Sequence, residues 1–111
     1  MRISREYNHP TIEITETGCS CNDSPDKTGR VSDVRRIDFY RQHLAELVRA
    51  IAEGARVRAY HAWTLEDNFE WQHGFTQRYG LTYVDFGSQK RTIKESGHWY
   101  ARVAAANRLD V

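Results

Sequence analysis

The order of predicted elements in the first half of the chain constrains its fold most. Residues 11–15 alternate apolar and polar side chains, which predicts a short strand running into a glycine turn at 16–18. Between a candidate cap at Asp33 and a stop at Gly54, apolar side chains recur every three or four residues, as in a helix with one buried face. Residues 57–63 fit a second strand, so the sequence predicts two parallel strands joined by a helix. The apolar positions of that helix are Ile37, Tyr40, Leu44, Leu47, Val48 and Ile51.

The remaining residues predict two loops, a further strand and a final helix. Residues 19–30 are polar, contain a proline and a Lys-Thr-Gly turn signal, and lack a sustained period, which favours a long surface loop. Residues 64–80 form an acidic and aromatic loop after the second strand. Residues 81–86 suit a short strand, and residues 94–108 suit a helix. We therefore expect an α/β chain of two consecutive β/α units.

Two parallel strands do not make a complete sheet. Parallel sheets are normally covered on both faces. A (β/α)8 barrel, or TIM barrel, uses about 250 residues and closes its sheet only with eight strands, so a chain of this length would supply about a quarter of one. We expect it to be incomplete as a single chain: either a partner completes the sheet, or the chain folds poorly.

The composition argues against several kinds of partner. Sixteen Lys and Arg against fifteen Asp and Glu give a formal net charge of +1, which does not favour nucleic acid or an anionic membrane. No segment approaches the roughly 20 apolar residues of a membrane span, and the N-terminus has no apolar signal region, so we expect a cytoplasmic protein.

The cysteines and histidines do not predict a metal site. Cys19 and Cys21 lie too close for an ordinary disulfide and are too few for a zinc site, so we expect free loop thiols. His61 and His73 are expected as pocket or loop residues and not as ligands. We expect no metal and no cofactor.

Glu16 is a candidate catalytic carboxylate. It ends the first predicted strand beside Gly18, and the carboxyl ends of strands are where barrels present catalytic side chains. The alternative is a solvated loop glutamate.

The loop after the second strand gathers indole rings and carboxylates within nine residues. Sugars offer C–H faces that stack on indole rings and hydroxyls that donate to carboxylates, so this mixture favours a carbohydrate site. The alternative is a core tryptophan with surface acids. The residues concerned are Trp63, Glu66, Asp67, Glu70 and Trp71.

Two segments carry a resemblance to a known family. Residues 14–18, Ile-Thr-Glu-Thr-Gly, resemble the Ile-Thr-Glu-Asn-Gly nucleophile motif of glycoside hydrolase family 1 β-glucosidases. Residues 63–71, Trp-Thr-Leu-Glu-Asp-Asn-Phe-Glu-Trp, are similar to the family's Trp-Ser-Leu-X-Asp-Asn-Phe-Glu-Trp segment. Residues 29–44, 74–81 and 90–100 also resemble family segments, in the same order, and the likeness extends from Tyr7 to about Val103.

The resemblance implies a fold and an activity. Residues 1–111 would be the C-terminal part of a family 1 barrel, the last two β/α units of a (β/α)8 TIM barrel: nucleophile strand, helix, last barrel strand and terminal helix. The implied activity is hydrolysis of terminal β-glucosides, or related sugars, with retention of configuration.

The resemblance also implies a role for each site residue. Glu16 would be the nucleophile, and Trp63 a stacking wall of the sugar pocket. Glu70 would accept hydrogen bonds from sugar hydroxyls, the Trp71 indole N–H would donate one, and Tyr79 would line the pocket floor. The neighbouring Asp67, Asn68 and Phe69 are expected to hold the loop.

The chain departs from the family in one respect that bears on chemistry. The family's acid/base glutamate lies in a Thr-X-Asn-Glu-Pro motif that does not occur here. General acid/base catalysis is worth about 10²- to 10⁴-fold, so we expect a truncated chain that is inactive or weak alone. A separate N-terminal fragment, or self-association, would cover the open sheet. The alternative function is a non-catalytic carbohydrate-binding or self-associating remnant.

Two smaller departures are Thr17, in place of the family's asparagine, and Ile93, where proline commonly opens the last helix.

Overall fold

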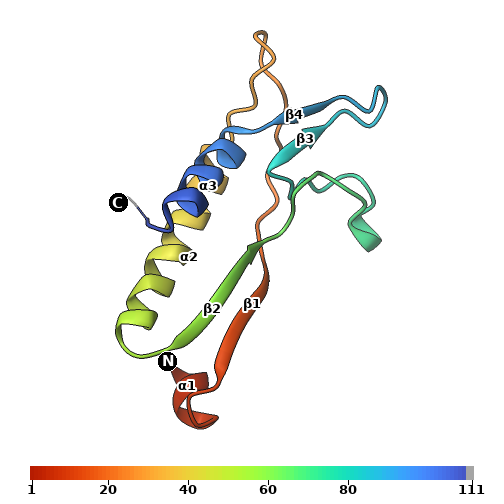
Figure 1. The fold of residues 1–111 in the computed structure, drawn as a ribbon. Coiled ribbons are helices and arrows are strands. Elements are labelled where there is room, and N and C mark those ends of the chain that lie inside the picture. Colours follow the sequence, from red (N-terminus) through yellow and green to blue (C-terminus); the bar gives the residue numbers. More distant parts are fainter. Residues whose placement is uncertain (110–111) are drawn as a thin grey trace.

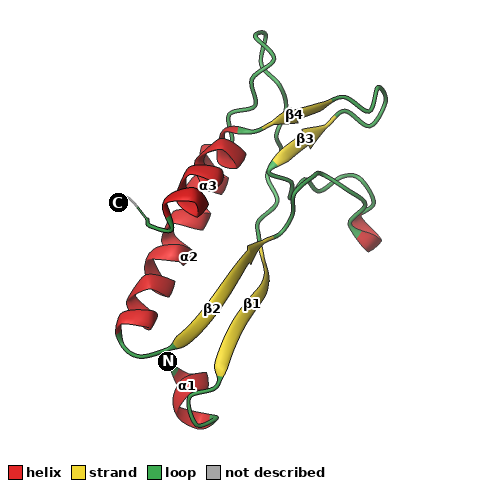
Figure 2. Cartoon of the chain, viewed as in Figure 1, coloured by secondary structure: helices red, strands yellow, loops and turns green. Residues whose placement is uncertain are grey.

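The computed structural model describes residues 1–109. Two helices form one layer and two parallel strands the other, with a small hairpin and the long loops beyond the carboxyl ends of the strands (Figures 1 and 2). None of the described helices is both long and apolar enough to cross a membrane. The elements are α1 (Arg2–Glu6), β1 (Thr11–Thr17), α2 (Val34–Ala52), β2 (Arg56–Ala62), the 3-10 helix η1 (Trp71–His73), β3 (Thr82–Val84), β4 (Arg91–Ile93) and α3 (Glu95–Ala106).

The structure confirms the predicted strand–helix–strand unit. Strands β1 and β2 are neighbours in a parallel sheet, and α2 connects them. Asp33 occupies the N-cap position of α2, but its side chain makes no capping bond and is engaged elsewhere. Gly54 follows the end of α2 with a φ of +98°, a left-handed conformation that favours glycine.

The C-terminal half differs from the prediction in its strands. The strand expected at 81–86 is present only as β3, and β3 pairs antiparallel with β4, which the sequence analysis did not predict. The short helix α1 was also not predicted. The final helix is confirmed, as α3. The second parallel strand is therefore β2, and the hairpin lies outside that sheet.

The chain is more extended than a closed domain. Its Cα radius of gyration is 15.9 Å, against about 13 Å for a compact domain of this length. Its accessible surface is 7772 Å², whereas a folded monomer of this mass exposes about 6,300 Å². The excess surface agrees with the expectation that two β/α units leave faces uncovered.

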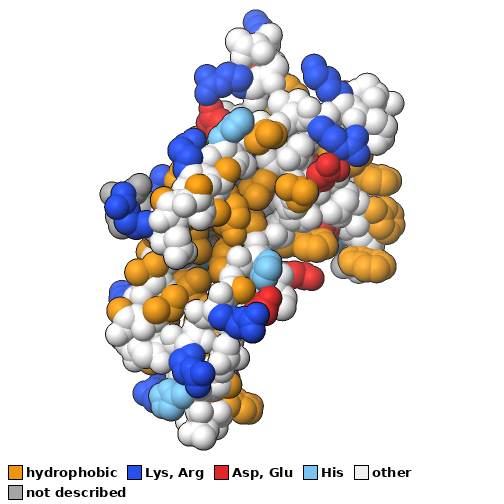
Figure 3. Space-filling view, viewed as in Figure 1, with side chains coloured by type: hydrophobic (Ala, Val, Ile, Leu, Met, Phe, Trp, Pro, Cys, Tyr) orange, Lys and Arg blue, Asp and Glu red, His pale blue; other side chains and the backbone are white. Residues whose placement is uncertain are grey.

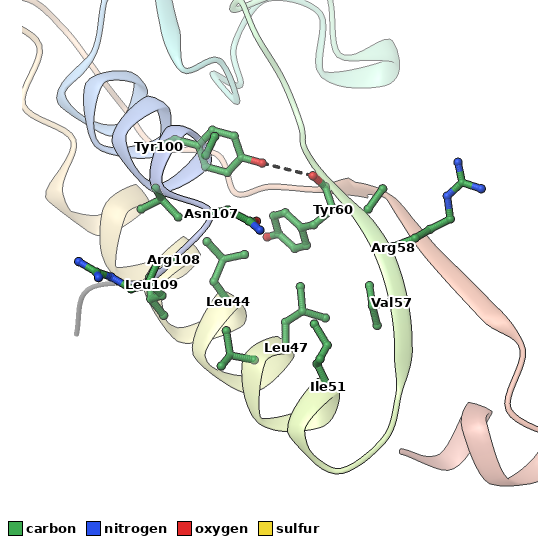
Figure 4. A pocket seen from close by; sticks show the side chains of 14 residues that line it. Leu44, Leu47, Ile51, Val57, Arg58, Tyr60, Tyr100, Asn107, Arg108 and Leu109 are labelled. Atoms are coloured by element: carbon green, nitrogen blue, oxygen red, sulfur yellow. Dashed lines mark hydrogen bonds between the residues drawn. The ribbon is translucent and has the colours of Figure 1, made fainter.

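One uncovered apolar region is an open groove of about 450 Å³ between α2, α3 and β2 (Figure 4). Leu44, Leu47 and Ile51 of α2 face Tyr60 of β2 across it. At its upper end the Tyr100 hydroxyl of α3 donates to the Tyr60 carbonyl at 3.3 Å. The helices therefore leave part of the space between themselves and the sheet unfilled.

A cluster of buried charges ties the two helices to the loops at the carboxyl ends of the strands. Arg36 of α2 is fully buried and pairs with Asp33 and, at 2.6 Å, with Asp23 of the 19–30 loop. Asp33 also accepts hydrogen bonds from the backbone N–H and hydroxyl of Ser96 in α3, at 2.9 and 2.5 Å. The N-termini of α2 and α3 are thus joined through one carboxylate.

The same cluster continues through Lys94. Its ammonium group, fully buried, lies 2.6 Å from Asp23 and 2.9 Å from Asp67. Asp67 in turn binds the Arg78 guanidinium at 2.7 Å and accepts from the Gly80 N–H at 2.9 Å. Three carboxylates and three cations balance in this network, which we call the ionic network: Asp23, Asp33, Asp67, Arg36, Arg78 and Lys94.

We predict that Lys94→Met destabilises the chain by about 3–5 kcal/mol, because it leaves two buried carboxylates without their shared cation. Urea unfolding followed by tryptophan fluorescence measures the loss. Lys90→Met, at an exposed position four residues earlier, is the matched control and should leave the midpoint nearly unchanged. Equal midpoints for the two variants would show that the network does not hold the fold.

Candidate functional site

Glu16 lies within a bulge in β1. Ile14 pairs with Tyr60 and Thr17 with Ala62, so three steps along β1 correspond to two along β2. Within this bulge Thr15 and Glu16 are both exposed, and the flanking Ile14 and Thr17 are half-buried. Bulges commonly re-aim side chains beside active sites. Here the bulge holds the exposed Glu16, one residue before the carboxyl end of β1.

Gly18 lets the ends of the two strands approach closely. The Trp63 N–H donates to the Thr17 carbonyl at 2.7 Å, and the Trp63 carbonyl accepts from the Tyr40 hydroxyl at 3.1 Å. A Cβ atom on Gly18 would lie 2.0 Å from that carbonyl oxygen, so no larger residue fits. The peptide bond between Trp63 and Thr64 is cis. Glu16 and Trp63 therefore end neighbouring strands at the same edge of the sheet.

Trp63 and Glu70 form a direct pair. The indole Nε1 of Trp63 donates to Glu70 Oε1 at 3.1 Å, and both side chains are half-buried. The Glu70 backbone is held by a hydrogen bond from its N–H to the Gly74 carbonyl at 2.7 Å. This fixes an indole ring and a carboxylate next to each other, the combination that sugar binding requires.

The other two predicted site residues lie in the same loop without joining this pair. Trp71 begins η1 with its side chain 83% exposed, and within residues 1–109 its indole makes no hydrogen bond or ring contact. Tyr79 is half-buried, and its carbonyl accepts from the Thr64 N–H at 3.2 Å. The structure thus brings Trp63 and Glu70 into contact, and it leaves Trp71 and Tyr79 as separate parts of the loop.

Asp67 holds this loop, as the sequence analysis expected. Besides its bonds to Lys94, Arg78 and the Gly80 N–H, its own N–H donates to the Thr82 carbonyl at 3.0 Å. Asn68 donates to the Glu66 carbonyl at 3.1 Å. These bonds fix both ends of the loop that carries Glu70.

Phe69 packs against the loop's own aromatic residues. Its ring lies edge-on to Phe75 at 5.5 Å between centroids. Phe75 in turn lies 4.6 Å from Phe86.

The cations of the ionic network were not identified from the sequence. Arg36, Arg78 and Lys94 meet carboxylates that lie between 3 and 71 residues away along the chain, so no local spacing marks most of these pairs. Only the Asp33–Arg36 pair has a spacing that the sequence could have indicated, because it matches an i, i+3 ion pair at the start of a helix.

The cysteines are free thiols, as predicted, and both are half-buried. Burial, together with the neighbouring Cys21, raises the pKa of the Cys19 thiol to about 11. Cys19 is therefore protonated at neutral pH. No group of three His, Cys, Asp or Glu residues within the described part of the chain is placed to hold a metal ion.

A parallel β–α–β segment with carboxylates and an indole ring at the carboxyl ends of its strands is typical of barrel enzymes. Comparison with known proteins identifies the family. Residues 1–109 match the model of Glycosyl hydrolase family 1, and the chain belongs to this family.

Several curated relatives cover nearly all of this chain. It is 42% identical over 109 residues to β-glucosidase A of Thermotoga maritima, covering 98% of this chain and 24% of the relative. It is 45% identical over 109 residues to a bifunctional β-D-glucosidase/β-D-fucosidase of Bifidobacterium breve, covering 95% of this chain and 24% of the relative. A 6-phospho-β-galactosidase of Streptococcus equi subsp. zooepidemicus is 44% identical over 112 residues, covering 100% of this chain and 24% of the relative.

The fold of this chain is also similar to solved structures of the family. A solved family 1 β-glucosidase from Thermotoga maritima superposes with a TM-score of 0.97 at 42% identity, covering 99% of this chain and 25% of that structure. The same enzyme in complex with isofagomine lactam gives a TM-score of 0.96. The chain thus spans about a quarter of the length of its relatives. The assignment of this chain to the C-terminal part of the barrel stays a prediction.

We predict that Gly18→Ala separates the strand ends and destabilises the chain by about 1–3 kcal/mol, since its Cβ meets backbone and not a movable side chain. Thermal unfolding and the near-ultraviolet circular dichroism of the tryptophans measure the effect. Gly87→Ala is the control: its Cβ would contact only the Asp85 carboxylate, at 3.3 Å. An unchanged tryptophan spectrum in Gly18→Ala would contradict the proposed close approach.

Proposed function

We propose that the chain supplies the nucleophile and part of the sugar-binding wall of a retaining β-glucosidase. The observation that carries this proposal is that the exposed Glu16 lies at the carboxyl end of β1, and the neighbouring strand β2 leads directly into the Trp63–Glu70 pair. The names of its similar relatives, several of them β-glucosidases, support the substrate class.

In the proposed reaction the Glu16 carboxylate attacks the anomeric carbon of a terminal β-glucoside and forms a covalent glycosyl-enzyme. Water then hydrolyses this intermediate, and the two displacements together retain the configuration. No metal or cofactor takes part in this mechanism. Glu16 is suited to the nucleophile's role because within residues 1–109 its carboxylate has no hydrogen bond or ion pair.

The remaining site residues would bind the sugar. One oxygen of Glu70 accepts from the Trp63 indole, which leaves the carboxylate's further acceptor sites for sugar hydroxyls. The Trp63 ring would stack on the apolar face of the sugar. Trp71, whose indole N–H is exposed, would donate to another hydroxyl, and Tyr79 would form the pocket floor.

The acid/base residue must come from outside this chain. A retaining mechanism needs a second carboxyl group about 5 to 5.5 Å from the nucleophile. The other carboxylates near this edge are engaged: Glu66 with Arg91 at 3.1 Å, Glu70 with Trp63, and Asp67 with Lys94. We therefore propose that a separate N-terminal fragment of the barrel, or self-association, completes the site.

The uncovered surfaces support a partner of this kind. Among the described strands, β1 and β2 pair only with each other, so each has a free edge. Free edges of parallel strands favour pairing with another chain. The apolar groove beside α2 and α3 adds a further surface that a neighbouring β/α unit would cover.

The alternative is a non-catalytic role in carbohydrate binding or self-association. It is favoured by the Trp63–Glu70 pair, which is formed within one loop and does not depend on Glu16.

We predict weak hydrolysis of an activated aryl β-glucoside by the purified chain, because such a leaving group needs little acid assistance. Glu16→Gln should lower the rate on the order of 10³-fold or more, since it removes the attacking group. Light scattering on the same sample reports whether the active species is an oligomer. Equal rates for the chain and the Glu16→Gln variant would reject the catalytic proposal.

The binding alternative predicts heat on titration with cellobiose that survives in Glu16→Gln. Trp63→Ala should weaken this binding about tenfold, as expected for the loss of one aromatic stacking contact. Trp99→Ala on α3, whose ring contacts Arg41, is the matched control and should bind normally. The absence of heat in the unmodified chain would remove this alternative.

A further inference from the structure

The loop that follows β1 carries two thiols with no role in the proposed site. Cys19 and Cys21 are free and half-buried, and one residue separates them in a segment that belongs to neither a helix nor a strand. Besides burial, the charge of Cys21 and a side-chain hydrogen bond with it raise the pKa of Cys19. The two thiols are therefore neighbours in space as well as in sequence.

The spacing of the two cysteines lies at the limit for a bridge. Two residues of chain span at most about 7 Å, and the Cα atoms of bridged cysteines lie about 4.4–6.8 Å apart. An ordinary structural disulfide does not form at this spacing, but a small ring can close once the backbone of the loop tightens. Bridges of poor geometry are more easily reduced, and such bonds are typically labile or regulatory.

The backbone of Cys21 is tied directly to the ionic network. Its N–H donates to the Arg78 carbonyl at 3.1 Å, and its carbonyl accepts from the Asp23 N–H at 2.9 Å. The same Arg78 carbonyl accepts from Nη2 of Arg36 at 2.7 Å. The Asp23 side chain, almost fully buried, lies 2.6 Å from both Arg36 and Lys94. A shift of the Cys21 backbone therefore acts on the hydrogen bonds that hold Asp23 in place.

The end of the molecule that carries this loop is rich in basic side chains. Lys27 of the loop and Lys90 of the β3–β4 hairpin are exposed and make no ion pair within residues 1–109. Arg30 and Arg91 add further positive charge, each paired with a glutamate. Figure 3 shows Lys and Arg side chains over the loop and the hairpin. Because exposed positive charge attracts anions, an anionic small-molecule disulfide such as glutathione disulfide suits this surface.

We propose that Cys19 and Cys21 form a reversible dithiol–disulfide pair, oxidised by small-molecule disulfides, and that closing the bridge displaces Asp23 from the ionic network. This inference does not depend on the proposed glycosidase activity.

The oxidation proceeds by two thiol–disulfide exchanges. The thiolate of one cysteine attacks a sulfur of the external disulfide, so that a mixed disulfide forms and one external thiolate leaves. The thiolate of the other cysteine then attacks the protein sulfur of this mixed disulfide, which forms the Cys19–Cys21 bond and releases the second external thiolate. The two external thiolates take up the two protons that the cysteines lost. The two protein sulfurs lose two electrons, and the external disulfide gains them.

The bridge is expected to lower the stability of the chain. Joining residues so close in sequence restrains the unfolded chain much less than closing a long loop does. Displacing Asp23 leaves the buried cations Arg36 and Lys94 each with one partner fewer, which is costly. The oxidised chain should therefore unfold at a lower urea concentration than the reduced chain.

The first experiment equilibrates the full chain at increasing ratios of glutathione disulfide to glutathione, then blocks free thiols with N-ethylmaleimide for mass spectrometry. Incubation must be long, because the protonated Cys19 thiol reacts slowly. We expect a species that is lighter than the reduced chain by two hydrogen atoms, carries no maleimide and is converted back by excess glutathione.

Cys19→Ser and Cys21→Ser are the matched controls. The chain contains no other cysteine, so each variant can form only a mixed disulfide with glutathione or a covalent dimer. An unmodified chain that likewise forms only these two products would overturn the proposal.

The second experiment tests the link to Asp23 by urea unfolding of the oxidised and reduced chains, followed by circular dichroism. The oxidised chain should have the lower midpoint. In the double variant Cys19→Ser, Cys21→Ser the midpoint should not depend on the glutathione ratio. Equal midpoints for the oxidised and reduced chains would show that Asp23 keeps its place in the network and would overturn this part of the proposal.

Discussion

The ionic network at the carboxyl ends of β1 and β2 holds this structure together. The described residues that are both apolar and buried are few: Val31, Tyr40, Ala55, Leu81 and Val84. Arg36 and Lys94 are the largest buried side chains besides Tyr40. Burying a charge is costly unless it is paired and hydrogen-bonded, and here each cation meets at least one carboxylate at hydrogen-bonding distance. Because removing one partner would leave an uncompensated buried charge, the network fixes where the loops lie.

That fixation explains how a loop of seventeen residues can carry a defined site. Asp67 joins the loop to α3 through Lys94 and to the following hairpin through Gly80 and Arg78. Trp63 is held from the other side by the Thr17 and Tyr40 contacts. A site held within a fraction of an ångström needs such supporting bonds. The Trp63–Glu70 geometry thus depends on residues that would not touch a sugar.

Much of the framework follows from the sequence because its signals are local. The alternation of residues 11–15 and the apolar spacing of residues 37–51 predict β1 and α2 from neighbours within a few positions. The ionic network depends on contacts across the fold, such as the Lys94–Asp23 pair, and no local pattern records them. The strand β4 was missed for a related reason: it has only three residues and owes its conformation to pairing with β3.

For the site, the sequence predicted residues but not their geometry. The motif predicted Glu16, but the register shift between β1 and β2 at this position is visible only in the pairing of the two strands. Likewise, the spacing of Trp63 and Glu70 suggested a shared site, and the hydrogen bond between them defines how the ring and the carboxylate lie. Trp71 lies next to Glu70 in sequence, yet its side chain is exposed and its indole makes no hydrogen bond or ring contact among residues 1–109.

The two faces of the β1–β2 pair differ in polarity, so a partner that completes the sheet would meet a different surface on each. The helix face is apolar and leaves an unfilled groove, so an adjoining β/α unit would gain by burying side chains such as Leu47 and Ile51. The opposite face carries Glu13, Arg58 and His61, and closing it inside a dry barrel would bury charges at a high cost unless they stay paired or hydrated. The partner proposed above would therefore be apolar where it meets the helices and polar where it meets Glu13, Arg58 and His61.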